Sequence, residues 1–211
     1  MIWVYGICEG PAAPPDGEGL AQAPLDGVRE GELLAVVSRH AEQPGDPALE
    51  ALWAHERVVE RIMADRAVLP MRFGTTVRHE DELREVLATR REELLAALAR
   101  VRGRVEVGVR AVQGGEDSGP VATTGREYVE AKLRVGHAAA ALHEPLASLA
   151  VAASQRPARG PDELLRAAYL IDAGALEGFR GAVERLQQAH PEVSVLCTGP
   201  WPPYSFVGGA G

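Results

Sequence analysis

Apolar runs separated by proline- and glycine-rich segments dominate the first half of the chain. Short runs that are rich in β-branched and aromatic residues and bounded by such punctuation are typical of strands. The pattern therefore predicts strands at Ile2–Cys8, Val28–Glu30, Leu33–Ser38 and Val68–Phe73.

Two amphipathic stretches in the same half predict helices. The first follows Asp46–Pro47, a capping residue and a proline suited to the first helical position, and it ends near Arg66. Its apolar face consists of Leu52, His55, Val59 and Ile62. The second begins with the acidic residues Glu80–Glu82 and ends at Gly103. Its core-facing stripe consists of Leu83, Leu87, Leu94, Leu98 and Val101. We therefore predict an N-terminal α+β domain over residues 1–102.

The second half predicts elements in the order β-α-β-β-α-β. A strand at Val105–Val112 precedes a helix that is opened by the capping box Thr124–Glu127 and ends before Pro145. The segment Leu164–Ile171 is interpreted as a strand, with a short helix as the alternative. The other elements are strands at Leu149–Ser154 and Val193–Thr198 and a helix marked by Leu176, Phe179, Val183 and Leu186. This order is typical of the ferredoxin-like fold, so we predict such a domain over residues 103–211.

The charge balance narrows the classes of partner. The 211 residues include 30 acidic and 22 basic side chains, which gives a formal net charge of −8. Affinity for nucleic acid comes largely from Lys and Arg, so we expect no nucleic-acid partner. The apolar runs are far shorter than the roughly 20 residues of a membrane helix, and the N-terminus lacks the features of a signal peptide. We therefore expect a cytoplasmic protein with no membrane partner.

The sequence lacks the common motifs of catalysis and cofactor binding. It contains no phosphate-binding loop, no dinucleotide fingerprint, no C-x-x-C and no G-x-S-x-G. The dipeptide His55-Glu56 begins like a zinc-binding H-E-x-x-H helix, but Val59 occupies the second histidine position. We interpret His55 as a packed, hydrogen-bonded histidine, with a general base as the alternative. We expect no catalytic, cofactor-binding or metal-binding residues.

Arg72 and the aromatic tail are the remaining candidates. Arg72 lies among apolar residues. The preferred interpretation is an internal ion pair, with Glu106 as a conceivable partner. The alternatives are that Arg72 points into solvent or that it contacts a partner protein. The tail Gly199–Phe206 combines stiff prolines with three aromatic residues, a composition that favours binding anchors. The preferred interpretation of the tail is a strap packed on the protein's own core, because termini are ordered only when they are tied down.

Several segments resemble the gas vesicle protein F/L family, in order along essentially the whole chain. They are Trp3–Ile7, Gly31–Ser38, His55–Glu56 with Val68–Thr75, Val105–Val109 with Gly125–Tyr128, and Thr198–Phe206. The resemblance implies an N-terminal α+β domain and a modified ferredoxin-like C-terminal domain. It also implies a cytoplasmic, gas-vesicle-associated accessory protein of vesicle assembly, without enzyme activity and without a cofactor.

The partners implied by the resemblance are the small hydrophobic shell protein and other gas vesicle accessory proteins. A soluble partner can cover the apolar surface of a shell monomer that would otherwise aggregate. The residues of the family motifs that we expect to build or support a partner-binding surface are His55, Glu56, Arg72, Phe73, Trp201, Tyr204 and Phe206. The alternative function is a ferredoxin-like regulatory module that binds a small molecule, or an enzyme, because one fold serves many functions.

Overall fold

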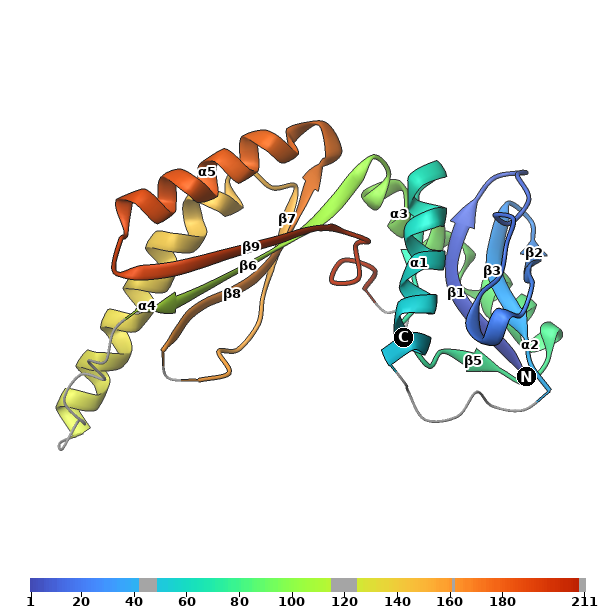
Figure 1. The fold of residues 1–211 in the computed structure, drawn as a ribbon, viewed down its shortest axis with the longest axis horizontal. Coiled ribbons are helices and arrows are strands. Elements are labelled where there is room, and N and C mark those ends of the chain that lie inside the picture. Colours follow the sequence, from blue (N-terminus) through green and yellow to red (C-terminus); the bar gives the residue numbers. More distant parts are fainter. Residues whose placement is uncertain (42–48, 115–124, 161, 209–211) are drawn as a thin grey trace. The chain divides into compact units, whose positions relative to one another are not determined.

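The chain folds into two compact units, which are Met1–Gly103 with Pro202–Gly211, and Arg104–Trp201 (Figure 1). Each unit contains one antiparallel sheet and its own helices, which confirms the predicted α+β class. From Pro202 onwards the tail groups with the first unit, whereas the sequence-based division assigned the whole tail to the second domain. The computed structural model of the chain describes residues 1–41, 49–114, 125–160 and 162–208.

The first unit is built on a sheet with strand order β2-β3-β1-β4, and β5 also pairs with β1. Its strands are β1 (Ile2–Glu9), β2 (Leu25–Glu30), β3 (Leu33–Arg39), β4 (Val68–Pro70) and β5 (Thr76–Val77). Its helices are the 3₁₀ turn η1 (Leu20–Gln22), α1 (Leu49–Asp65), α2 (Glu80–Thr89) and α3 (Arg91–Val101).

Both faces of this sheet are covered by helices, which explains why β1 is a nearly continuous apolar run. Side chains of successive strand residues point to opposite faces. Ile2 and Val4 therefore belong to the core cluster under α2 and α3. Trp3 and Tyr5 belong to the cluster under α1.

Two predicted elements of this unit differ from the structure. The long helix expected after Glu80 is two helices, because Arg90 leaves helical geometry with φ −101° and ψ 16°. The break allows the apolar residues of both α2 and α3 to reach the same face of the sheet. The strand expected to reach Phe73 ends at Pro70, because the backbone turns there and Thr75 N–H donates to the carbonyl oxygen of Arg72.

The apolar face of α1 is also rotated from the predicted one. His55, Val59 and Ile62 are buried as expected, but Val58 completes the buried face and Leu52 is exposed. The helix packs through its second half, so its first turn extends beyond the core. The predicted cap Asp46–Pro47 lies outside the described residues.

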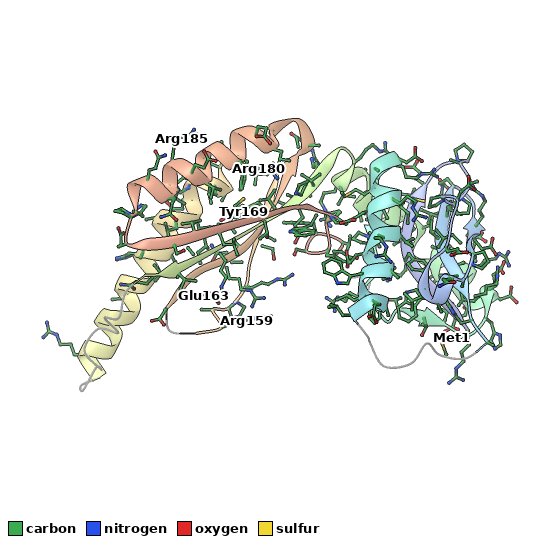
Figure 2. The ribbon with its side chains drawn as sticks, viewed as in Figure 1. Met1, Arg159, Glu163, Tyr169, Arg180 and Arg185 are labelled. Atoms are coloured by element: carbon green, nitrogen blue, oxygen red, sulfur yellow. The ribbon has the colours of Figure 1, made fainter. Side chains whose placement is uncertain are left out.

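The second unit is built on a sheet with strand order β7-β8-β6-β9. Its strands are β6 (Arg104–Gln113), β7 (Ala152–Gln155), β8 (Glu163–Asp172) and β9 (Val193–Trp201). Its helices are α4 (Gly125–Ala147), the 3₁₀ turn η2 (Ala173–Ala175) and α5 (Leu176–Ala189). Both long helices pack on one face of the sheet, where Tyr169 lies buried (Figure 2). The ring centroid of Tyr169 is 5.3 Å from that of Phe179.

Three element boundaries in this unit differ from the predictions. Helix α4 continues through Pro145 to Ala147, because buried Leu142 and Leu146 hold its last turn on the sheet. Strand β7 starts later than predicted, since Leu149 is still in the turn that ends α4. Strand β9 continues past the predicted end to Trp201, with a register shift in its pairing to β6. The predicted capping residue at position 124 lies outside the described residues.

Candidate functional site

His55 is fully buried where α1 packs on the sheet. Trp3 Nε1 donates a hydrogen bond to His55 Nδ1 at 3.0 Å, and His55 Nε2 contacts the carbonyl oxygen of Met71 at 2.9 Å. An indole N–H can only donate and a carbonyl oxygen can only accept. These partners therefore require the neutral imidazole with its proton on Nε2. Burial lowers the pKa of His55, which favours the same neutral form.

Both ring nitrogens of His55 are thus occupied by structural partners. Phe73 completes the surroundings, with its ring centroid 4.9 Å from that of Trp3 and 5.7 Å from that of His55. A general base needs a nitrogen that can reach a substrate proton. The geometry agrees with the packed histidine and leaves neither nitrogen for proton transfer.

The tail packs on the first unit as a strap. Pro202–Pro203 is buried, and Phe206 is only 8% exposed. Tyr204 Oη donates to Glu56 Oε1 at 2.9 Å, and Arg100 donates to the carbonyl oxygen of Phe206 at 2.6 Å. Burial raises the pKa of Glu56, although the hydrogen bond from Tyr204 opposes this change. The tail agrees with the preferred strap interpretation from Pro202 onwards.

Trp201 and Arg72 differ from this pattern. Trp201 is the last residue of β9 in the second unit and is 41% exposed, so it is not part of the strap. Arg72 is exposed, and within the described residues it takes part in no ion pair. The preferred interpretation of an internal ion pair is therefore wrong, because the Arg72 side chain lies at the surface. Glu106, named as a conceivable partner, belongs to the second unit.

An exposed apolar stripe occupies the first turns of α1. Leu49, Leu52 and Trp53 are 65%, 39% and 53% exposed. Their spacing of three and four residues places them on one helix face, and Glu56 is next along that face. The α1 stripe (Leu49, Leu52 and Trp53) therefore leads towards the strap, which Glu56 holds through Tyr204.

Sequence reasoning did not find the α1 stripe, nor Trp3 and the Met71 carbonyl as the partners of His55. One signal was available for the stripe. The apolar arc of α1, from Leu49 to Ile62, is wider than one buried face requires, and an amphipathic helix needs only one such face. The partners of His55 are distant in sequence, so periodicity along one helix cannot reveal them.

The family described as gas vesicle synthesis protein GvpL/GvpF matches residues 1–119 and 122–208 of the chain. The chain belongs to this family. Gas vesicle protein F of Streptomyces sp. (strain CB03234) is 33% identical, and the match covers 97% of this chain and 98% of that protein. Gas vesicle protein F2 of Halobacterium salinarum is 28% identical, with 98% and 91% covered.

Solved structures of other GvpL/GvpF members share the fold. The crystal structure of GvpF from Anabaena sp. PCC7120 superposes with a TM-score of 0.83 at 20% identity, over 98% of this chain and 95% of that one. GvpF from Microcystis aeruginosa gives a TM-score of 0.81 at 20% identity, with 98% of each chain covered. At this identity the likeness concerns the fold alone.

Membership in the GvpL/GvpF family supports a role in gas vesicle assembly. Within the part of the chain that the structure describes, His, Cys, Asp and Glu side chains form no group of three that could hold a metal ion. In the same part, no helix combines the length and the apolar character that crossing a bilayer requires.

Proposed function

We propose that this GvpL/GvpF member is a gas vesicle assembly accessory protein that binds the hydrophobic shell protein through the α1 stripe. One observation carries the proposal beyond family membership. Leu49, Leu52 and Trp53 are large apolar side chains that lie exposed together on one helix face. Contiguous exposed apolar residues mark interaction sites, and tryptophan is among the residues that most often anchor them.

The energetics fit a partner that is itself apolar. Complete burial of one large apolar side chain is worth about 1.5–3 kcal/mol, and the three residues of the stripe are one-third to two-thirds exposed. An amphipathic helix commonly docks its apolar face in a hydrophobic groove of its partner. The shell protein, which the family resemblance implies as a partner, would gain cover for its apolar surface until it joins the vesicle.

The residues of the family motifs take two roles in this proposal. His55 and Phe206 are buried and can only support the surface from within. Glu56 and Tyr204 are half-buried and tie the strap to α1, while Phe73 packs over Trp3 and His55. Arg72 and Trp201 are exposed and can touch a partner directly, as can the exposed part of the half-buried Tyr204.

The finer description of the fold and of location belongs to the same proposal. We infer that Arg104–Trp201 is a ferredoxin-like unit, supported by its element order β-α-β-β-α-β and its strand order β7-β8-β6-β9. We further infer that the protein works in the cytoplasm, in association with gas vesicles and with other accessory proteins of their assembly.

The test is capture of the shell protein in cells that co-express both proteins. We expect the double variant Leu52→Ala/Trp53→Ala to capture at least tenfold less shell protein than the wild type. The matched control is Leu149→Ala/Val151→Ala, which removes two side chains that are about half exposed in the second unit. Equal capture by both folded double variants would exclude the α1 stripe.

A companion variant tests the direct role of the tail. If Trp201 or Tyr204 contacts the shell protein, a folded Trp201→Ala/Tyr204→Ala variant captures less of it. Unchanged capture by this variant would restrict both residues to structural roles and leave the α1 stripe as the contact.

A further inference from the structure

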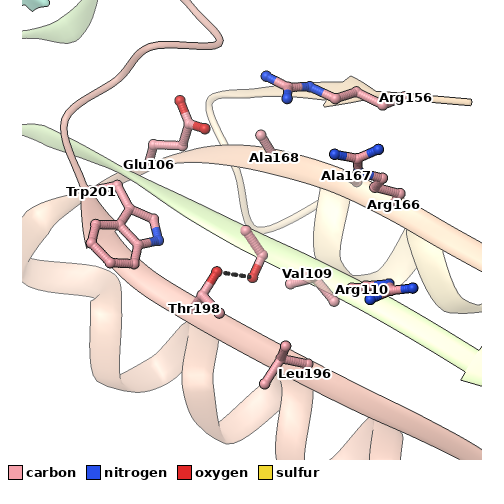
Figure 3. A pocket seen from close by; sticks show the side chains of 11 residues that line it. Glu106, Val109, Arg110, Arg156, Arg166, Ala167, Ala168, Leu196, Thr198 and Trp201 are labelled. Carbon is pink, nitrogen blue, oxygen red and sulfur yellow. Dashed lines mark hydrogen bonds between the residues drawn. The ribbon is translucent and has the colours of Figure 1, made fainter. Parts of the chain in front are cut away.

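The second sheet carries a pocket of about 300 Å³ on the face opposite α4 and α5 (Figure 3). The pairing register arranges most of its lining in three rows that run across the strands. The rows are Leu196, Arg110 and Arg166; Thr198, Gly108 and Ala168; and Trp201 with Glu106.

The first row carries an excess of positive charge. Arg110 and Arg166 lie directly opposite each other on β6 and β8, an arrangement of like charges that destabilises a sheet. Glu163 offsets part of this, because its buried carboxylate accepts Arg110 Nε at 2.6 Å and the N–H of Arg159 at 2.5 Å. The hydrogen bond from the Arg159 N–H, followed by that from Arg110 and the charge of Arg166, holds the pKa of Glu163 below its usual range. Arg156 adds a further guanidinium to the lining.

Arg166 is attracted by the Glu163 carboxylate but, in the described part of the chain, forms no ion pair with it. It is half-buried in the pocket, and within the described residues its guanidinium has no hydrogen-bond partner. Arg110 donates to Glu163 through Nε, and its side chain remains 54% exposed. A single guanidinium is a planar fork that suits a carboxylate, and this row carries two of them on adjacent strands.

The second row provides a low floor, and the third row adds the Trp201 ring beside the Glu106 carboxylate. A Cβ atom added at Gly108 would lie 2.8 Å from Thr198 Oγ1, so the floor stays low only with glycine there. Trp201 and Glu106 stand at the far side, four residues along β6 from Arg110. Four residues of strand span about 13 Å, enough for the side chains of one peptide segment.

We propose that this arginine pocket (Arg110, Arg166, Gly108, Thr198 and Trp201) binds an acidic polypeptide segment that also carries an apolar side chain. A carboxylate of the segment meets the two arginines, and the apolar side chain lies on the floor beside Trp201. The arginine pocket shares no residue with the α1 stripe, so this proposal does not rest on capture of the shell protein through α1.

A polypeptide fits the arginine pocket better than a nucleic acid does. Sheets that bind RNA stack two or three bases on aromatic side chains, whereas this pocket offers only Trp201. Glu106 beside Trp201 and the net charge of −8 would repel a run of phosphates. One carboxylate next to one apolar group avoids both penalties.

The test uses the full chain and a fluorescein-labelled peptide of glycine and serine that carries one glutamate four residues away from one phenylalanine. Fluorescence anisotropy gives its dissociation constant, and a peptide with glutamine in place of glutamate is the comparison. We expect the glutamate peptide to bind at least tenfold more tightly than the glutamine peptide, and to weaken as salt is raised. Arg166→Gln should remove most of this preference, and Trp201→Ala should weaken both peptides.

Arg185→Gln is the matched control, because Arg185 is an exposed arginine on α5, which covers the opposite face of the sheet (Figure 2). It removes the same charge and should leave binding unchanged. Arg166→Glu is a second test, because this variant should bind a peptide with lysine in place of glutamate more tightly than the glutamate peptide. Equal binding of the glutamate and glutamine peptides would overturn the proposal. Equal weakening by the Arg166→Gln and Arg185→Gln variants, or tighter binding of oligouridylate than of the glutamate peptide, would do the same.

Discussion

Replacement of His55 by leucine tests the buried network most directly. Leucine has a similar volume, so the change leaves little cavity but removes both hydrogen bonds of the imidazole. The indole N–H of Trp3 and the carbonyl oxygen of Met71 then remain buried without these partners. Each buried polar group left in this way costs about 1–3 kcal/mol. We therefore expect His55→Leu to lower the free energy of unfolding of the first unit by about 2–6 kcal/mol.

A loss of this size is a large part of the stability of a domain, which is typically about 5–15 kcal/mol. With a urea dependence of about 2 kcal/mol per molar, a loss of 4 kcal/mol moves the unfolding midpoint by about 2 M. His55→Gln is the matched variant, because its amide oxygen can accept from Trp3 and its amide nitrogen can donate to Met71. We expect His55→Gln to lose less than half as much stability as His55→Leu.

The assay is urea unfolding followed by tryptophan fluorescence in a Trp53→Phe/Trp201→Phe background, so that Trp3 alone reports. This restriction matters because two compact units need not unfold in one transition. The reasoning is refuted if His55→Leu unfolds at the same urea concentration as its parent. It is also refuted if the glutamine variant is as unstable as the leucine variant.

Three further outcomes follow from individual contacts. Burial lowers the pKa of His55 in the folded state below its value of 6.5 in the unfolded chain. The contribution of His55 to the free energy of unfolding is therefore complete above pH 6.5 and is lost as the pH falls towards the folded pKa. Urea midpoints at several pH values should reveal a slope of up to about 1.4 kcal/mol per pH unit, reduced in His55→Gln. Tyr204→Phe removes the bond to Glu56, worth about 1 kcal/mol, and should speed hydrogen exchange in the strap roughly fivefold. Gly199 has φ +113°, and a Cβ atom added there would lie 2.8 Å from a carbonyl oxygen. Gly199→Ala should therefore destabilise the second unit by about 1–3 kcal/mol in thermal unfolding. Gly136→Ala is the control and should cause no such loss, because a Cβ atom added at Gly136 meets nothing within 4 Å.

Periodicity and punctuation were sufficient to predict most of the elements. The alternation in Val105–Val112 and the apolar run Ile2–Cys8 identified β6 and β1, because strand geometry depends on local side-chain pattern. The break at Arg90 was missed for the opposite reason. The apolar stripe remains in phase across it, and tertiary packing alone requires the turn.

The candidate site was less predictable from the sequence. His55 and Tyr204 were identified as notable residues, but their partners are 52 and 148 positions away in the sequence. Such distances depend on how the chain folds back, which local patterns do not contain. Arg72 illustrates the same limit, since its apolar neighbours suggested an internal pair although the end of β4 turns its side chain to solvent.

The His55 network and the α1 stripe are linked because they lie on one rigid helix. Apolar packing alone tolerates small rotations of a helix, whereas the two directional hydrogen bonds of His55 permit one orientation. That orientation also decides where Trp53 points. Under the proposed function, His55→Leu should therefore capture less shell protein than its folded fraction predicts, and His55→Gln should capture in proportion to it. Capture that follows the folded fraction in both variants would show that the histidine acts on stability alone.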